Sequence, residues 1–381
     1  MGGSSTKSEF VSVLADKQVK EGEDVTLCCT KNPGEVTAKW KKNGHSLECV
    51  EGKHTTEKSE TTCSLIIKNA EKADEGNYTL TLEYKAGSVS CSAMVIVELN
   101  EWRTVQWEQD PTITTLKNFK IGNAKLRELR FLLNGPVGAG KSSTISTIKS
   151  IFEGHQFINC LAASDLNSGM SFTTKYQKFS IGTLPFAFYD VMGLEEDKED
   201  GQSKGVRSDD IIKALMGHIA NDYEFKQECS ICEDSKYYIS DPTLKDKIHC
   251  LVSVIAADKV TLMDDKVIQK MKTIRAEASK LGIPQLVFMT RVDKVCTVTE
   301  KDLTKIYQSK KIKEKMEECS TRLGVPMNCI FPLKNYHEEI KMNEKLNCLV
   351  LEAFTQAVYS ANDYVKKFSR KEKCLECFIF I

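Results

Sequence analysis

A glycine-rich segment between an apolar run and a helical run constrains this chain more than any other feature. The segment GPVGAGKSS, residues 135–143, follows LRFLLN and precedes TISTIKSIF. The spacing of Gly135, Gly140, Lys141 and Ser142 matches the phosphate-binding loop that joins a buried strand to the first turn of a helix. Backbone N–H groups of such a loop converge on a phosphate at the helix N-terminus. The sequence therefore predicts an α/β domain that binds a nucleotide.

The phosphates should contact the loop backbone and a few side chains. Lys141 would reach the β- and γ-phosphate oxygens, and the Ser142 hydroxyl would complete the shell of a Mg²⁺ ion. The strand LPFAFYD ends in a D-x-x-G segment, in which Asp190 orders Mg²⁺ and the Gly193 N–H senses the γ-phosphate. The expected phosphate-binding residues are Gly135, Gly138, Ala139, Gly140, Lys141, Ser142, Ser143 and Gly193.

Residues between and after these motifs bear on the metal ion and on hydrolysis. Thr173 and Thr174 in SFTTKY are candidates for the first switch contact to Mg²⁺ and the γ-phosphate, with plain surface threonines as the alternative. The expected metal ligands are Ser142, Asp190, Thr173 and Thr174. Leu194 stands where small GTPases carry the Gln that orients water, which predicts slow turnover. No catalytic residue is assigned, and Arg207 is only a candidate arginine finger.

A third motif at the end of an apolar strand bears on the base. IPQLVFMTRVDK contains Thr290, Arg291 and Asp293 in an arrangement similar to the [N/T]-K-x-D segment of GTPases. The two oxygens of such an Asp accept from guanine N1–H and the exocyclic amine, a donor pair that adenine lacks. Asp293 therefore favours GTP and GDP over ATP, although Arg291 replaces the usual Lys. Asn335, in the loop after the last strand, should lie near the base.

The first hundred residues follow a different pattern. Residues 9–99 are short alternating strands separated by turn residues. Cys29, Trp40 and the DEGNY segment 74–78 resemble the core Cys, the packed Trp and the tyrosine corner of an I-set immunoglobulin-like sandwich. Leu80 stands where the second bridge Cys would be, so the inter-sheet disulfide cannot form. We expect a module that recruits a protein partner, with a passive folded spacer as the alternative.

The chain is therefore expected to be multidomain, with an all-β sandwich followed by an α/β P-loop GTPase-like domain. A long charged segment, residues 195–247, separates the D-x-x-G segment from the next strand; it is either a solvated insertion or a mobile switch. The expected segments are an immunoglobulin-like domain at 9–99, a linker docked through Trp102 and Trp107 at 100–124, the P-loop domain at 125–365, and a basic, Cys-containing tail at 366–381.

Composition limits the partners and the compartment. Lys plus Arg (53) balance Asp plus Glu (53), so no global field attracts nucleic acid, and no nucleic-acid partner is expected. No apolar run approaches the roughly 20 residues of a membrane span, and the start lacks a signal peptide, which favours the cytoplasm. The 15 cysteines fit reduced thiols. The pairs Cys229/Cys232 and Cys374/Cys377 have zinc-ligand spacing, but free thiols are the preferred interpretation.

Both ends carry lipidation candidates. The start fits the N-myristoylation pattern with Gly2 as the acceptor. The end combines basic residues with Cys374 and Cys377, which are palmitoylation candidates but do not fit the prenylation box. A basic cluster or a second lipid would complete an anchor to a membrane surface, and a frayed helix end is the alternative.

The run NEWRTVQWEQ, the segment LKNFKIGNAKLRELRFLLNGPVGAGKSS, YDVMGL and DPTLKDKIHCLVSVIAAD together resemble the interferon-induced protein 44 family over residues 100–365. The resemblance implies a cytoplasmic, interferon-inducible, GTPase-like protein of innate immunity and antiviral defence. The immunoglobulin-like half departs from the members we know, so their partners do not transfer through it. We expect a GTP-binding switch with slow hydrolysis, accelerated in a nucleotide-dependent homodimer. The alternative is a non-hydrolysing scaffold that acts through its immunoglobulin-like domain.

Overall fold

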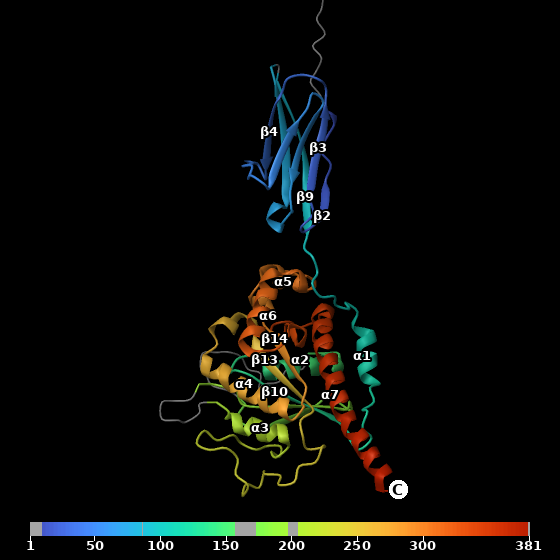
Figure 1. The fold of residues 1–381 in the computed structure, drawn as a ribbon, viewed down its shortest axis with the longest axis vertical. Coiled ribbons are helices and arrows are strands. Elements are labelled where there is room, and N and C mark those ends of the chain that lie inside the picture. The colour runs from blue at the N-terminus through green and yellow to red at the C-terminus, as the bar shows by residue number, and fades with distance from the viewer. Residues whose placement is uncertain (1–9, 86, 157–172, 197–204, 380–381) are drawn as a thin grey trace, which may run out of the picture. The chain divides into compact units, whose positions relative to one another are not determined.

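A computed structural model of the protein describes residues 10–85, 87–156, 173–196 and 205–379, with side chains described as far as residue 369. The chain divides into two compact units, Met1–Trp102 and Arg103–Ile381 (Figure 1). The first unit is built from strands, and the second combines a sheet with helices.

The first unit is a sandwich of two β-sheets. One sheet has the order β1 (Phe10–Ser12), β3 (Val25–Lys31), β7 (Thr62–Ile67), β6 (His54–Lys58). The other has the order β2 (Lys17–Lys20), β9 (Gly87–Glu98), β8 (Gly76–Tyr84), β4 (Thr37–Lys42), β5 (His45–Ser46). Neighbouring strands are antiparallel except β2 and β9, which run parallel. A short 3-10 turn, η1 (Lys72–Asp74), precedes β8.

The core of this sandwich confirms the immunoglobulin-like prediction. Cys29 and Trp40 are buried between the sheets. The Tyr78 hydroxyl donates to the Asp74 carbonyl at 2.8 Å, which is the tyrosine corner. Leu80 is fully buried and Cys29 is a free thiol, with burial raising the pKa of Cys29 to about 12. Apolar packing between the sheets thus replaces the disulfide bridge.

The second unit is organised around one six-stranded sheet. Its order is β11 (Gln177–Ser180), β12 (Phe186–Asp190), β10 (Leu129–Asn134), β13 (Cys250–Ala256), β14 (Gln285–Thr290), β15 (Ile330–Pro332). All neighbouring strands are parallel except β11, which pairs antiparallel with β12. The strands from β12 to β14 are almost continuously buried, as a parallel sheet covered on both faces requires.

Two groups of helices cover this sheet (Figure 1). The long helix α7 packs against α1 and α2, whereas α4 packs against α3 and α6. Phe354 of α7 lies 5.2–5.6 Å, ring centre to ring centre, from Phe131, Phe186 and Phe188 of the sheet. The helices are α1 (Gln109–Lys117), α2 (Lys141–Glu153), α3 (Ser208–Met216), α4 (Asp265–Lys280), α5 (Thr297–Lys301), α6 (Lys310–Leu323) and α7 (Glu344–Ile379), with 3-10 turns η3 (Ala257–Leu262), η4 (Val292–Lys294), η5 (Leu303–Gln308) and η6 (Met327–Cys329).

Two segments extend this domain beyond the 125–365 range expected from the sequence. Residues 103–124 belong to the second unit and include α1, with Leu116 fully buried. The Trp107 ring lies 5.8 Å from the Lys345 ammonium on α7. Helix α7 continues to Ile379, so most of the expected tail is helical. Among the described residues, no helix is both long enough and apolar enough to cross a membrane.

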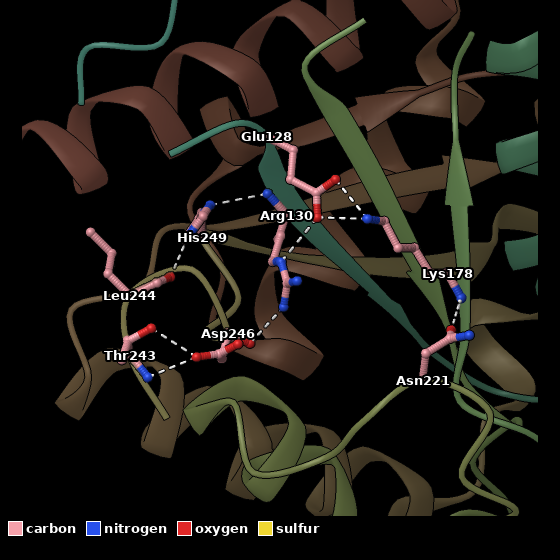
Figure 2. A network of polar contacts seen from close by, with 8 residues as sticks. All are labelled: Glu128, Arg130, Lys178, Asn221, Thr243, Leu244, Asp246 and His249. Atoms are coloured by element: carbon pink, nitrogen blue, oxygen red, sulfur yellow. Dashed lines mark hydrogen bonds and ion pairs between the residues drawn. The ribbon is translucent and has the colours of Figure 1, made fainter. Parts of the chain in front are cut away.

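A polar network fixes the amino-terminal end of β10 (Figure 2). The Arg130 backbone N–H donates to His249 Nδ1 at 3.0 Å, so Nε2 carries the proton and donates to the Leu244 carbonyl at 2.9 Å. Burial lowers the pKa of His249 to about 4. The Glu128 carboxylate pairs with Arg130 at 3.2 Å and with Lys178 at 2.7 Å. The start of the central strand is therefore held by the residue that precedes β13 and by β11, at the end opposite to the glycine-rich loop.

Candidate nucleotide site

The glycine-rich loop connects the end of β10 to the start of α2. Gly140 immediately precedes α2 with φ +91°, in the left-handed region that favours glycine. A Cβ at Gly140 would also lie 3.1 Å from Asn335 Nδ2. The other expected loop residues are Gly135, Gly138 and Ala139, and Ser142 and Ser143 stand in the first turn of α2. The loop thus has the strand–turn–helix context that a phosphate-binding loop requires.

Two charged side chains are buried beneath this loop. The Lys141 ammonium donates to the carbonyls of Gly135 and Pro136, both at 3.2 Å. Asp190, at the end of β12, is 1% exposed and accepts from the Ser142 hydroxyl at 2.5 Å. Burial raises the pKa of Asp190, although Lys141 opposes that shift, and burial lowers the pKa of Lys141. A bound anion could therefore compensate the charge of Lys141, and a bound cation could compensate the charge of Asp190.

Thr173 joins Ser142 and Asp190, whereas Thr174 does not. The Thr173 hydroxyl donates to Asp190 Oδ2 at 3.3 Å and lies 3.4 Å from the Ser142 hydroxyl. Thr174 is exposed, and its carbonyl accepts from the Phe225 N–H at 2.9 Å. One carboxylate and two hydroxyls form a hard oxygen set that fits Mg²⁺, which usually takes few protein ligands together with phosphate oxygens.

No site for a softer metal ion is found in the part of the chain that the structure describes. Within that part, no group of three or more His, Cys, Asp or Glu side chains could hold a metal ion. Cys229 and Cys232 are exposed free thiols. The side chains of Cys374 and Cys377 lie outside the described residues.

The D-x-x-G segment lies directly on the glycine-rich loop. The Leu194 N–H donates to the Gly135 carbonyl at 3.0 Å, and the Val137 N–H donates to the Leu194 carbonyl at 3.3 Å. A Cβ at Gly193 would lie 2.3 Å from Val137 Cγ2, so only glycine fits there. The Leu194 side chain is 1% exposed and has no polar group with which to orient a water molecule.

The long segment after this loop is connected to it. The Val206 N–H donates to the Gly193 carbonyl at 3.1 Å. Val206 is followed by Arg207, the residue that caps the start of α3. The Arg207 guanidinium donates to the Gln227 carbonyl at 3.2 Å, within the same segment. Arg207 is therefore used here as a structural contact between α3 and the chain that follows it.

Three side chains at the end of β14 and just beyond it differ in their contacts. The Thr290 hydroxyl donates to the Ala139 carbonyl at 2.7 Å and so ties this segment to the glycine-rich loop. The Arg291 guanidinium forms a 3.0 Å ion pair with Asp258, which follows β13. In the described residues, the Asp293 carboxylate makes neither a hydrogen bond nor an ion pair. Asp293 is thus an available acceptor at this end of the sheet.

Asn335 links the last strand to the helix that follows the loop. Its Nδ2 donates to the Gly140 carbonyl at 3.2 Å and to the Thr144 hydroxyl at 3.0 Å. Its Oδ1 is buried and finds no hydrogen-bond partner among the described atoms. The side chain therefore supports the loop with its nitrogen and leaves one acceptor open.

Asp258 was missed by reasoning from the sequence. It follows the buried strand in HCLVSVIAAD, just as Asp190 follows the buried strand in LPFAFYD. In an open α/β sheet, residues that follow parallel strands gather at one edge. An acidic residue two positions beyond a buried strand was therefore the available signal for Asp258.

Comparisons with known proteins find similar proteins for both parts of the chain. Residues 8–97 match the model of the immunoglobulin I-set domain. Interferon-induced protein 44 from Mus musculus and from Homo sapiens are each 32% identical to this chain over 260 residues, or 67% of its length. A match of that length lies mostly beyond the immunoglobulin domain. Over that stretch the chain is a homologue of interferon-induced protein 44.

The match spans 60% of the mouse interferon-induced protein 44 and 57% of the human one. The crystal structure of the titin M3 domain is 28% identical to this chain, covering 24% of this chain and 96% of that one, with a TM-score of 0.22. The resemblance to interferon-induced protein 44 expected from the sequence is confirmed by these relatives. The expected I-set domain is confirmed by the family model.

Proposed function

We propose that the second unit has a P-loop GTPase fold, binds GTP or GDP with Mg²⁺, and acts as a nucleotide-dependent switch with slow hydrolysis. The observation that carries this proposal is the meeting of Ser142, Thr173 and Asp190 at the foot of the glycine-rich loop. These residues come from three separate segments of the chain. Their oxygens converge where the strand–loop–helix geometry directs a phosphate.

Each polar group of the site has a role in this proposal. Bound Mg²⁺ would supply charge neutralisation for the phosphate oxygens. Lys141 would exchange its two carbonyl contacts for charge-assisted hydrogen bonds to phosphate, which are roughly twice as strong as neutral ones. Asp190 would balance the charge of the cation, and Ser142 would offer it a hydroxyl oxygen. The site therefore needs little rearrangement of its buried side chains.

The base preference in this proposal depends on Asp293. Among the described residues its carboxylate has no partner, so both oxygens can accept from guanine N1–H and the exocyclic amine. Thr290 supports that geometry, because its hydroxyl fixes the segment to the Ala139 carbonyl. Adenine would offer Asp293 no matching donor pair, so we expect GTP to bind more tightly than ATP.

The decisive experiment changes Asp293 to Asn and measures the binding of GTP, ATP and xanthosine triphosphate with Mg²⁺. Xanthine carries a carbonyl where guanine carries its amine, so an amide donor at position 293 should favour it. Hydrogen bonds to charged groups contribute about 1.5–3 kcal/mol, so GTP affinity should fall about 10- to 100-fold while xanthosine triphosphate affinity rises. Mg²⁺-tripolyphosphate, which has no base, should bind both proteins equally. Equal GTP and ATP affinities in the unaltered protein would contradict guanine selectivity.

A second candidate function is a nucleotide-bound scaffold that does not hydrolyse GTP. Leu194 favours it, because the buried apolar side chain cannot orient a water molecule and its backbone is held by Gly135 and Val137. In that case the nucleotide would stabilise the fold, and the immunoglobulin domain would bind the protein partner. We favour the switch because the Val206 N–H donates to the Gly193 carbonyl. This hydrogen bond connects the D-x-x-G segment to the chain that leads into α3.

The cellular setting is part of the proposal. The name of the relatives supports induction by interferon and with it an immune role. Antiviral defence and a cytoplasmic location stay predictions. Homodimerisation and attachment to a membrane surface stay predictions. Of the lipidation candidates, Gly2 lies outside the described residues, and Cys374 and Cys377 stand in the last turns of α7.

A further inference from the structure

An ion pair joins the ends of the two strands that flank the proposed base site. Strands β13 and β14 are parallel neighbours, with Ala256 opposite Thr290. Asp258 follows the first strand and Arg291 follows the second, and Asp258 Oδ2 lies 3.0 Å from Arg291 Nη2. The side chains are only 23% and 30% exposed, so solvent screens this pair less than an ordinary surface pair.

Arg291 stands two residues before a second carboxylate, that of Asp293. Arg291 has a left-handed backbone with φ +59° and immediately precedes the η4 turn that contains Asp293. Asp293 is the acidic residue nearest to Arg291 in sequence and hence a candidate alternative acceptor for its guanidinium, which is always charged. In the structure Asp258 holds it, and Asp293 has no ion-pair partner among the described residues.

Asp258 has a physical reason to retain Arg291. Its second oxygen, Oδ1, is buried without a hydrogen-bond partner in the described part of the chain. Releasing Arg291 would leave Asp258 as a partly buried, uncompensated charge, which is strongly unfavourable. Lys334, a further cation within electrostatic reach of Asp293, is likewise engaged elsewhere, in a 2.6 Å ion pair with Glu339. Lys334 is thus paired with another carboxylate, as Arg291 is.

We propose that Asp258 is a positioning residue for guanine: by holding Arg291 it keeps the oxygens of Asp293 free for the base and fixes the aliphatic part of Arg291 beside it. This inference rests on the proposed function and deepens it, because it names what makes an Arg compatible with guanine selectivity at a position that usually holds Lys. Lys has a compact charge, whereas the longer guanidinium fork matches carboxylates and would otherwise occupy Asp293.

The test measures nucleotide affinity in the full chain carrying Asp258→Asn. An amide at 258 keeps the shape but loses the charge, so Asp293 becomes the stronger acceptor for Arg291. Occupation of Asp293 should weaken GTP binding about tenfold, the cost of one hydrogen bond to a charged group. Mg²⁺-tripolyphosphate affinity should not change, whereas general damage to the site would weaken both ligands. Adding Arg291→Met, which removes the charge and keeps an aliphatic side chain, should restore GTP affinity to within about threefold of the unaltered protein.

Asp265→Asn is the matched control. Its ion pair with Arg322 has the same 3.0 Å length, but the Asp265 side chain is 97% exposed, so GTP affinity should not change. An Asp258→Asn variant that binds GTP as tightly as the unaltered protein overturns the inference, and so does a double variant that is no better than the single one. Failure of the proposed function looks different, because the unaltered protein itself would then show no preference for GTP.

Discussion

Acidification should destabilise the second unit through His249. The ring is fully buried, and its Nδ1 accepts the Arg130 N–H, so protonation would both charge a buried group and remove that acceptor. The two charged neighbours of the ring have opposite effects, since Arg130 disfavours the protonated ring and Glu128 favours it. The Tyr364 ring lies 6.3 Å from the His249 ring, centre to centre. Burial dominates and lowers the pKa of His249 from 6.5 to about 4.

The sign and size of the effect follow from proton linkage. A depressed pKa means that the unfolded chain binds the proton more tightly, so this contribution is present above pH 6.5 and is lost as the pH falls toward 4. Integrating between pH 7 and pH 5 gives a loss of about 2 kcal/mol in the free energy of unfolding.

Urea unfolding of the unaltered protein and of His249→Asn at both pH values measures this loss. Asn keeps an acceptor near the Nδ1 position but lacks the Nε2–H donor to Leu244, so the variant should be about 1 kcal/mol less stable at pH 7. Because Asn does not titrate, the two proteins should differ in pH dependence by about 2 kcal/mol. The immunoglobulin domain is identical in both and serves as an internal reference. The same pH dependence in both proteins would refute the assignment of a buried, neutral His249.

Two further predictions concern Leu194 and the first unit. The rate of single-turnover GTP hydrolysis should be low in dilute protein, because Leu194 cannot orient water. The rate should rise with protein concentration if two nucleotide domains pair. Rapid turnover in dilute protein would contradict this reasoning. Changing Leu80 to Cys should allow a bridge to Cys29 under oxidising conditions and stabilise the immunoglobulin domain by about 2–4 kcal/mol. Thermal unfolding with and without a reducing agent measures the gain, and a melting temperature insensitive to the reductant would show that position 80 does not face Cys29.

Local sequence patterns predicted the element types because neighbouring residues decide them. The run LRFLLN forms a strand and the segment after Gly140 forms a helix, since an apolar run and a glycine-rich turn are sufficient signals. Helix α1 was not predicted, because residues 109–117 are largely polar and their helix is stabilised by packing against α7. The continuation of α7 to Ile379 was also missed, as its last turns are rich in charge.

Some residues of the candidate site were likewise predictable from the sequence, and others were not. The residue types at Ser142, Asp190 and Asp293 were predictable, since each motif stands at the end of an apolar strand. Whether Thr173 or Thr174 joins Asp190 was not predictable, because adjacent residues offer the same hydroxyl and only the path of the chain decides which one reaches the carboxylate. The engagement of Arg207 by Gln227 likewise depends on an irregular segment without a sequence signature.

The sequence by itself determined that this chain has an immunoglobulin-like sandwich without its disulfide and a strand–loop–helix suited to phosphates, because these features depend on residue type and short-range spacing. Tertiary structure alone decided the charge partners. Arg291 is two residues from Asp293 in sequence, yet it pairs with Asp258, 33 positions earlier, because parallel strands bring their ends to one edge of the sheet. The pairing of Arg291 with Asp258 is therefore a property of the fold, which spacing along the sequence does not reveal.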